Sequence, residues 1–239
     1  MLNVTLPDGS VRNYSNLVTP LDIAGDIGPG LARAVIAAEI DGALVGLDFQ
    51  LPGEGNVALK LLTKDDPQTL KVLRHSSAHV MARAVMRLFE GVQRAFGPWI
   101  DNGFYYDFQL DHKLSEDDFS AIEAEMANII KLNEPFERLV EPRNQAMEIC
   151  QDLGQPLKVE HIETGLADQE TLSFYRQGEF LDLCRGPHVR SAKLVGKAFK
   201  ILSVAGAYWK GDNSRQQLQR LYATAFWDKS QLETYLHQL

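Results

Sequence analysis

The chain has 239 residues, of which 45% are hydrophobic and 23% are charged, and its formal net charge is -8. This length predicts one or two domains, and the composition is that of an ordinary globular protein. No run approaches the ~18 apolar residues of a membrane span, and no basic stretch followed by an apolar one opens the chain. Two cysteines cannot build a disulfide framework, so we expect a cytoplasmic protein without a signal peptide or membrane segment.

Positive charge is concentrated in one segment of this acidic chain. Between Cys184 and Arg220 there are eight lysines and arginines and one acidic residue, whereas the remainder has 16 basic and 31 acidic residues. A basic segment in an acidic chain is a candidate phosphate-binding surface. The alternative is a set of scattered, solvated lysines, which a charge count does not exclude.

The first sixty residues predict a small β-rich domain. Their order of hairpin, helix, hairpin and strand is typical of a ubiquitin-like β-grasp. An Asp-Gly pair suits the second hairpin turn, and Thr19-Pro20 suits a helix start. The predicted elements are strands at 4–6 and 11–14, a helix from Thr19 to about Asp26 that Gly28-Pro29-Gly30 breaks, strands at 35–40 and 43–47, and a strand at 57–62.

A polar break at 64–67 marks the start of a second domain, in which strands follow helices. That order predicts an α+β fold. The first helix is expected at 67–89 with one buried stripe, comprising Leu70, Leu73, Ser77, Val80, Ala84 and Leu88. The other predicted elements are a strand at 103–108, helices at 115–132 and 142–154, strands at 157–161, 171–175, 179–183, 199–204 and 217–223, and a helix at 228–239. We therefore expect domains at 1–63 and 64–227, followed by a linker helix at 228–239.

Two short motifs collect scarce reactive side chains. His75 and His79 are four residues apart on the predicted helix, so both project from one face. Cys184-Arg-Gly-Pro-His188 places a thiol and an imidazole on either side of residues that favour a rigid turn. These four donors form a chemically good tetrahedral Zn²⁺ set, closed if structural and open to water if catalytic. The alternative is a metal-free site in which a histidine takes a proton from water.

Several other site types are excluded by missing motifs. There is no Gly-x-x-x-x-Gly-Lys-Ser/Thr loop, so we expect no P-loop nucleotide site. There is no Gly-x-Ser-x-Gly elbow, which disfavours a serine esterase. Ser76 stands where a zinc protease of the His-Glu-x-x-His type has its glutamate.

The chain resembles the N-terminal half of bacterial-type threonyl-tRNA synthetases. The resemblance is carried, in order along the chain, by Leu6-Pro-Asp-Gly-Ser10, Asp26-Ile-Gly-Pro-Gly30, His75-Ser-Ser-Ala-His79, Gly97-Pro98, Asp101-Asn-Gly-Phe-Tyr-Tyr-Asp107, Cys184-Arg-Gly-Pro-His188 and Ala205-Gly-Ala-Tyr-Trp209. It implies a β-grasp TGS domain followed by an editing domain similar to the second additional domain of alanyl-tRNA synthetases. The family's aminoacylation core and anticodon-binding domain have no counterpart in these residues. The resemblance thus implies an excised fragment or a free-standing editing protein that cannot activate an amino acid.

The activity implied by this resemblance is hydrolysis of seryl-tRNA(Thr), the product of mistaking serine for threonine. One methylene is worth only about 1–3 kcal/mol in a binding pocket, so a second site must exclude the larger threonine. The implied partner is the acceptor end of tRNA(Thr) carrying serine. The family dimerises through a part absent here, so we expect a monomer.

The resemblance also assigns roles to residues. The expected catalytic set is His75, His79, Lys158, Asp182, Cys184 and His188, with His75 and Lys158 activating water and a tRNA ribose hydroxyl assisting. Asp182 is the expected partner of Lys158 or of the substrate ammonium group. Tyr106 and Gly97 are expected to bind substrate. Without the resemblance, Lys158 and Asp182 would be interpreted as a surface ion pair and Tyr106 as a core aromatic.

The relatives differ in their use of metal. Alanyl-type editing domains hold zinc with this constellation, whereas threonyl-type domains work without it. We therefore expect no required cofactor, with zinc on His75, His79, Cys184 and His188 as the alternative. The basic segment is expected to guide tRNA, with Tyr208-Trp209 either stacking a base or buried. Its candidate tRNA-binding residues are Lys193, Lys197, Lys200, Lys210 and Arg215.

Two other functions remain open at this point. One is a non-catalytic RNA-binding or regulatory module in which the TGS domain is the ligand-binding or partner-binding element. The other is a zinc-dependent hydrolase of a small ester or amide.

Overall fold

The computed structural model describes all 239 residues, and the chain divides into two compact units. The first unit comprises Met1–Val72 and the short segment Gly186–Arg190. The second comprises Leu73–Arg185 and Ser191–Leu239. None of the helices is both long and apolar enough to cross a membrane.

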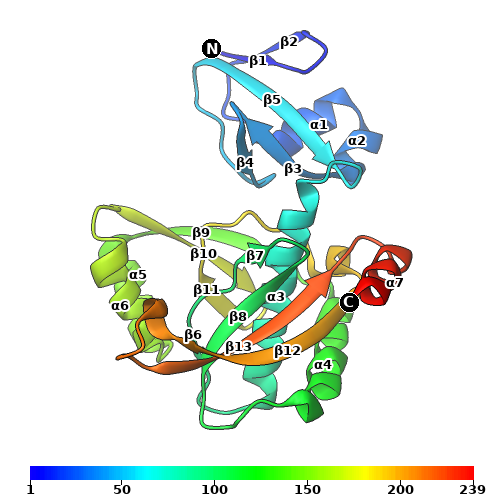
Figure 1. The fold of residues 1–239 in the computed structure, drawn as a ribbon. Coiled ribbons are helices and arrows are strands. Elements are labelled where there is room, and N and C mark those ends of the chain that lie inside the picture. The colour runs from blue at the N-terminus through cyan, green and yellow to red at the C-terminus, as the bar shows by residue number, and fades with distance from the viewer. The chain divides into compact units, whose positions relative to one another are not determined.

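The N-terminal unit has the β-grasp topology that its sequence predicts (Figure 1). Its sheet order is β2-β1-β5-β3-β4, with β1 and β5 parallel and the other pairs antiparallel. Alternate residues of β1 and β5, including Leu2, Val4, Val57 and Leu59, are buried with Ile23 of the first helix. The elements are β1 (Leu2–Thr5), β2 (Val11–Tyr14), α1 (Pro20–Ile27), α2 (Pro29–Ala34), β3 (Val35–Ile40), β4 (Ala43–Val45) and β5 (Gly55–Thr63).

Local signals fix the ends of these elements. Thr19 caps α1 by accepting a hydrogen bond from the backbone of Asp22, whose carboxylate accepts one in return from Thr19. Asp41 and Gly42 both have positive φ, 49° and 85°, as a tight hairpin turn requires. The short helix α2 was not predicted. Pro29, interpreted as a helix breaker, instead occupies the first turn of this helix, where its missing N–H is no loss.

The second unit is α+β, with helices and two antiparallel sheets. One sheet has the order β11-β10-β9, and the other has the order β12-β13-β8-β6, with β7 paired to β8. The helices are α3 (Thr69–Leu88), α4 (Phe119–Leu132), α5 (Arg143–Asp152), α6 (Pro156–Gly165) and α7 (Lys229–Gln238). The strands are β6 (Gln93–Arg94), β7 (Trp99–Ile100), β8 (Gly103–Gln109), β9 (Glu137–Pro142), β10 (Thr171–Gln177), β11 (Phe180–Leu183), β12 (Phe199–Tyr208) and β13 (Gln217–Ala225). Short 3-10 turns at Glu116–Asp118, Ala192–Val195 and Trp209–Gly211 complete the unit.

The helix α3 is buried on all sides rather than along one stripe. From Val72 to Val85 every residue is buried except His75, which is half-buried. The predicted stripe is therefore wrong at its ends, where Leu70 is half-buried and Leu88 is 41% exposed. Arg74 donates to the carbonyl of Ala225 at the end of β13, which ties the helix to the larger sheet. A helix enclosed in this way gives its side chains fixed positions.

One strand of the second unit was predicted wrongly, and another strand, β9, was missed. Residues 157–161 were expected to form a strand, but they belong to α6. Pro156 lies in the first turn of that helix, and Leu157 and Ile162 are buried in two separate apolar clusters, so tertiary packing overrides the alternating pattern. The strand β9 was not predicted. The residues of β9 pair with β10, although the sequence of β9 has no clear alternation of apolar and polar residues that would indicate a strand.

Candidate functional site

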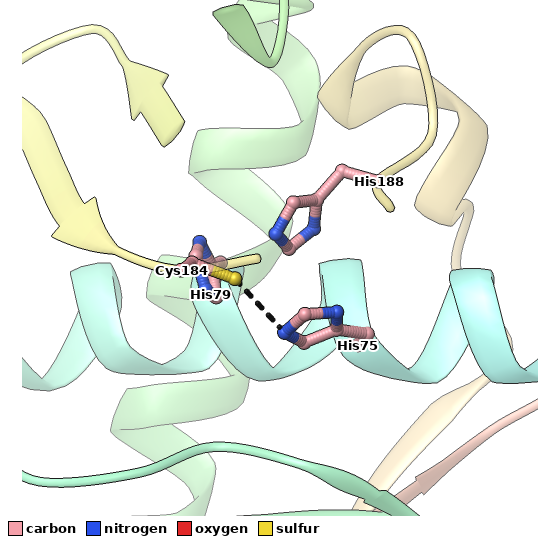
Figure 2. A group of neighbouring side chains, drawn as sticks. All are labelled: His75, His79, Cys184 and His188. Atoms are coloured by element: carbon pink, nitrogen blue, oxygen red, sulfur yellow. Dashed lines mark hydrogen bonds between the residues drawn. The ribbon is translucent and has the colours of Figure 1, made fainter. Parts of the chain in front are cut away.

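The helix α3 and the loop after β11 bring together the reactive residues of the two motifs. His75 and His79 extend from one face of α3, and Cys184 follows β11 directly (Figure 2). The Cys184 Sγ lies 3.2 Å from His75 Nε2. The ring centroids of His75 and His79 are 5.3 Å apart, and the rings are arranged edge to face. His188 joins them, and one ligand atom from each of the four residues lies within 4.8 Å of the others. The segment between Cys184 and His188 has no regular secondary structure, and it contains Gly186 at a φ of 72° and a cis Gly186–Pro187 bond.

A buried carboxylate is the centre of the neighbouring polar cluster. Asp182 is 2% exposed, and its Oδ1 lies 3.1 Å from the ammonium of Lys158. Its Oδ2 accepts a hydrogen bond from the Tyr106 hydroxyl at 2.5 Å and lies 3.8 Å from His79 Nε2. Lys158 is itself 3% exposed, so the pair is not a surface ion pair.

The ionisation of this cluster follows from burial and from its cations. Burial raises the pKa of Asp182, but the charges of Lys158 and Arg94 lower it by more, to about 2, so the carboxylate is ionised at neutral pH. Desolvation lowers the pKa of His79 well below its ordinary value despite the attraction of Asp182. His79 is therefore neutral at neutral pH. Burial raises the pKa of Tyr106 well above its ordinary value, so that hydroxyl remains a donor.

Tyr106 and Gly97, predicted to bind substrate, are in contact with each other. The Tyr106 ring is fully buried and its hydroxyl donates to the Asp182 carboxylate. A Cβ at Gly97 would overlap the Tyr106 ring. Glycine is therefore needed at position 97 to let the chain pass over the ring.

Two residues of this cluster were missed from sequence. Arg94 of β6 is 2% exposed, donates to the Leu181 carbonyl at 2.6 Å, and places Nη1 3.5 Å from Asp182 Oδ1. Gln155 is buried before α6 and accepts a hydrogen bond from the Arg94 backbone N–H while its amide donates to Val92. The only local signal for Arg94 is a charge within the short, mostly apolar segment Val92-Gln-Arg-Ala-Phe96, and this signal does not reveal the partner of Arg94.

The residues predicted to bind tRNA fall into two groups. Three of them are ion-paired: Lys200 with Glu123 at 2.9 Å, and Lys210 and Arg215 with Glu160 at 3.1 and 2.6 Å. The other two, Lys193 and Lys197, are exposed on and beside the Ala192–Val195 turn, and neither has a carboxylate partner. The basic segment is thus partly neutralised by acidic residues outside it.

Trp209 is a core residue. Its side chain is fully buried, it stacks on Phe96 with ring centroids 5.2 Å apart, and its indole N–H donates to Glu160 at 3.0 Å. Of the two interpretations offered for this tryptophan, burial is confirmed. Tyr208 remains 44% exposed.

The four donors near His75 have the chemistry that zinc accepts. Bonds of about 2.0–2.3 Å around a tetrahedral ion place its ligand atoms roughly 3.3–3.8 Å apart. The pair formed by Cys184 and His75 is near that spacing, whereas the set as a whole extends over as much as 4.8 Å. These residues could hold such an ion, and the prediction that none is required stays a prediction.

Comparison with known families identifies both units. A TGS domain matches residues 2–60, and the second additional domain of threonyl and alanyl tRNA synthetases matches residues 172–222. The latter range contains Asp182, Cys184 and His188, whereas His75, His79 and Lys158 precede it. The predicted α+β fold class with a TGS domain is confirmed, whereas the predicted domain boundaries stay predictions.

Curated relatives give the same answer along the whole chain. The chain is 58% identical over 243 residues to a threonine–tRNA ligase of Rhodopirellula baltica, with 100% of the chain and 32% of that protein covered. It is 49% identical to that of Granulibacter bethesdensis and 46% identical to that of Clostridioides difficile, of which it covers 36% and 37%. The chain thus spans about a third of the length of these relatives. Along its whole length the chain is thus similar to threonine–tRNA ligases, and it carries a TGS domain and a second additional domain of the threonyl and alanyl tRNA synthetase type.

Proposed function

We propose that the second unit removes serine from mischarged seryl-tRNA(Thr) by hydrolysing the ester between serine and the terminal ribose. The threonine–tRNA ligases that the chain resembles face a substrate pair differing by one methyl group. A methylene is worth only about 1–3 kcal/mol in a pocket, so discrimination by one binding site is weak. A second site that admits serine and excludes threonine supplies the missing accuracy.

The observation that carries this proposal is the pairing of an accessible imidazole with a buried, charged cluster. His75 is the one member of α3 between Val72 and Val85 that is not buried, and Cys184 beside it is also half-buried. Lys158 and Asp182 are almost fully buried. Water and ester can thus reach His75, while Lys158 and Asp182 offer fixed charges that need no reorganisation during the reaction.

The proposed reaction is one addition and one elimination. A water oxygen bonds to the ester carbonyl carbon while His75 takes the water proton. The carbonyl oxygen becomes an oxyanion, which Lys158 stabilises. The bond from carbon to the ribose oxygen then breaks, and the ribose oxygen takes the proton from His75. Serine and tRNA with a free terminal hydroxyl are released, and a neighbouring ribose hydroxyl can hold the water.

Supporting roles follow from the contacts of the remaining residues. Asp182 fixes Lys158, and Tyr106 fixes Asp182 through its hydroxyl. Neutral His79 contacts the rings of Phe180 and His75, and it orients the His75 ring. Gly97 keeps the wall over Tyr106 thin and rigid, which suits a pocket that excludes threonine by steric overlap. Cys184, beside His75, and His188 are proposed to contact the seryl group.

The first experiment compares hydrolysis of seryl-tRNA(Thr) and threonyl-tRNA(Thr) by the full chain, with and without a chelator. We expect the seryl ester to be cleaved, the threonyl ester to be spared and the chelator to have no effect. Inactivation by chelator with recovery on adding Zn²⁺ would instead support the zinc-dependent alternative, which the four clustered donors favour. No cleavage by a folded chain that binds tRNA would overturn the proposal in favour of a binding module.

The His75→Ala variant separates chemistry from binding. Loss of the proton acceptor should reduce hydrolysis by about 10²–10⁴-fold. Affinity for tRNA should change little, because most such affinity comes from phosphate contacts. Equal loss of affinity and rate would argue against a chemical role for His75.

The tRNA surface is proposed to depend on the unpaired lysines. Each lysine that contacts a phosphate contributes about 1 to the slope of log affinity against log salt. Exchanging Lys193 and Lys197 for alanine should therefore lower affinity and reduce that slope by about 2. Lys200→Ala is the matched control, because Glu123 already pairs with that ammonium. An equal effect of the control would contradict this assignment.

A further inference from the structure

The cluster around Asp182 contains one more positive charge than negative charge. Asp182 is shared by two cations, with Lys158 Nζ at 3.1 Å and Arg94 Nη1 at 3.5 Å, both measured to Oδ1. The side chains of all three residues are at most 4% exposed. The Tyr106 hydroxyl donates to Oδ2 of the same carboxylate, and His79 Nε2 lies 3.8 Å from that oxygen. A buried excess charge is costly, so its retention calls for a reason.

Arg94 is held firmly enough to keep that position. Its guanidinium donates to the carbonyl of Leu181, the residue before Asp182, and lies 5.0 Å above the Phe180 ring. Its backbone N–H donates to the side chain of Gln155. Gln155 directly precedes α6, and Lys158 lies on the first turn of that helix. Arg94 and Gln155 therefore connect the strand that carries Asp182 to the helix that carries Lys158.

A single carboxylate paired only with Lys158 would neutralise it. An ammonium fully compensated by a carboxylate offers little to a developing oxyanion, because the nearby negative charge repels the new one. With Arg94 sharing the same oxygen, the cluster retains one positive charge in a low-dielectric site. Such a preorganised charge favours an anionic transition state over a neutral ester.

We propose that Arg94 is a positioning residue of this site, which shares the Asp182 carboxylate so that Lys158 keeps an uncompensated positive charge for the oxyanion. This inference rests on the proposed ester hydrolysis. It predicts that loss of Arg94 changes the rate of the chemical step rather than substrate binding.

The first test is the kinetics of Arg94→Met on seryl-tRNA(Thr). We expect kcat to fall about 10- to 100-fold, the loss that accompanies removal of a supporting partner outside direct contact, with KM within about 2-fold of the wild-type value. Arg94→Lys, which retains the charge, should recover most of kcat. A merely structural role would instead reduce the folded fraction and leave kcat per folded molecule unchanged, and that result would overturn the proposal.

Arg74→Met is the matched control. Arg74 is also a buried arginine that donates to a backbone carbonyl and lies over a phenylalanine ring, that of Phe226, at 5.1 Å, but it has no carboxylate partner. Its replacement should lower the urea midpoint of unfolding and leave kcat within about 2-fold. A kcat loss equal to that of Arg94→Met would show that buried arginines act only through the fold, and would overturn the proposal.

The second test does not depend on hydrolysis. In the wild-type background, Arg94→Met should lower the urea midpoint of unfolding. In the Asp182→Asn background the same substitution should raise the midpoint, because it removes one of two cations that have lost their carboxylate. Additive midpoint shifts would overturn the shared carboxylate. If Asp182→Asn does not fold, recovery of folding by the added Arg94→Met change is the expected result. If the wild-type chain cleaves no seryl-tRNA, the proposed function fails, and these midpoints alone decide whether the carboxylate is shared.

Discussion

Two carboxylates in this protein have nearly the same partners and very different surroundings. Asp182 is held by Lys158, Arg94 and the Tyr106 hydroxyl. Glu160 is held by Lys210, Arg215 and the Trp209 indole. Each thus has two cations and one aromatic donor, but the side chain of Asp182 is 3% exposed and that of Glu160 is 25% exposed.

The pKa is about 2 for both carboxyl groups, but the causes differ. For Glu160 the hydrogen bond from Trp209 is the largest cause, and burial matters less. For Asp182 burial acts first and in the opposite direction, and the cations overcome it. The same set of partners therefore forms a weak surface ion-pair network around Glu160. Around Asp182 it forms a buried ion-pair network with a large desolvation cost.

The largest expected difference between the clusters is in stability. Asp182→Asn leaves two buried cations without a counter-charge, and breaking a buried pair in this way costs about 3–5 kcal/mol. Urea unfolding at neutral pH measures this free energy. A loss below that of a typical surface pair would show that water reaches Arg94 and Lys158.

A smaller difference is expected at the glycine beside each cluster. Gly97→Ala should cost about 1–3 kcal/mol, because its Cβ would overlap the enclosed Tyr106 ring and force the core to shift. Gly165→Ala is the matched change, since its Cβ would lie 2.8 Å from Nδ1 of His161. His161 is only half-buried and can rotate away. Thermal unfolding of both variants should show the larger shift for Gly97→Ala, and equal shifts would contradict the difference in rigidity.

The two clusters also contain histidines that affect stability through pH. Desolvation lowers the pKa of His161 to about 4 and that of His79 well below its ordinary value of 6.5. The unfolded chain therefore binds protons that the folded chain does not, and stability should fall as pH drops below about 6.5. Unfolding midpoints between pH 7.5 and 4.5 measure the slope. His161→Gln should flatten it in part, because His79 remains, and an unchanged slope would exclude His161 as a cause.

The smallest effect is expected at Glu160. Glu160→Gln removes the charge that pairs Lys210 and Arg215, all three of which are at least 25% exposed. Such pairs contribute about 0–1 kcal/mol, and added salt weakens them further. Urea midpoints at low and high salt test this prediction. A loss of stability comparable to that of Asp182→Asn would show that the two clusters do not differ in their contribution to stability.

Sequence predicted the parts of this protein that rest on local rules. The Thr19 cap, the Asp41-Gly42 turn and the spacing of His75 and His79 follow from residue chemistry within a few positions. The residues that complete the Asp182 cluster are distant in sequence and lie on short or ambiguous elements. Arg94 is on a two-residue strand, and Lys158 is on a helix whose sequence alternates like a strand. Long-range packing decides the secondary structure at Arg94 and at Lys158, and no local sequence pattern indicates that packing.

The enclosure of α3 has a consequence for how this protein tolerates mutation. A helix on a surface alternates permissive and restricted positions with the period of its turn, whereas α3 has no solvent-facing side between Val72 and Val85 except at His75. A saturation mutagenesis profile scored on folding should therefore show an unbroken block of intolerance there, with one gap at His75. In a profile scored on deacylation, substitutions at His75 should be as poorly tolerated as those at its neighbours. The position most free to vary for folding would then be the one most constrained for chemistry.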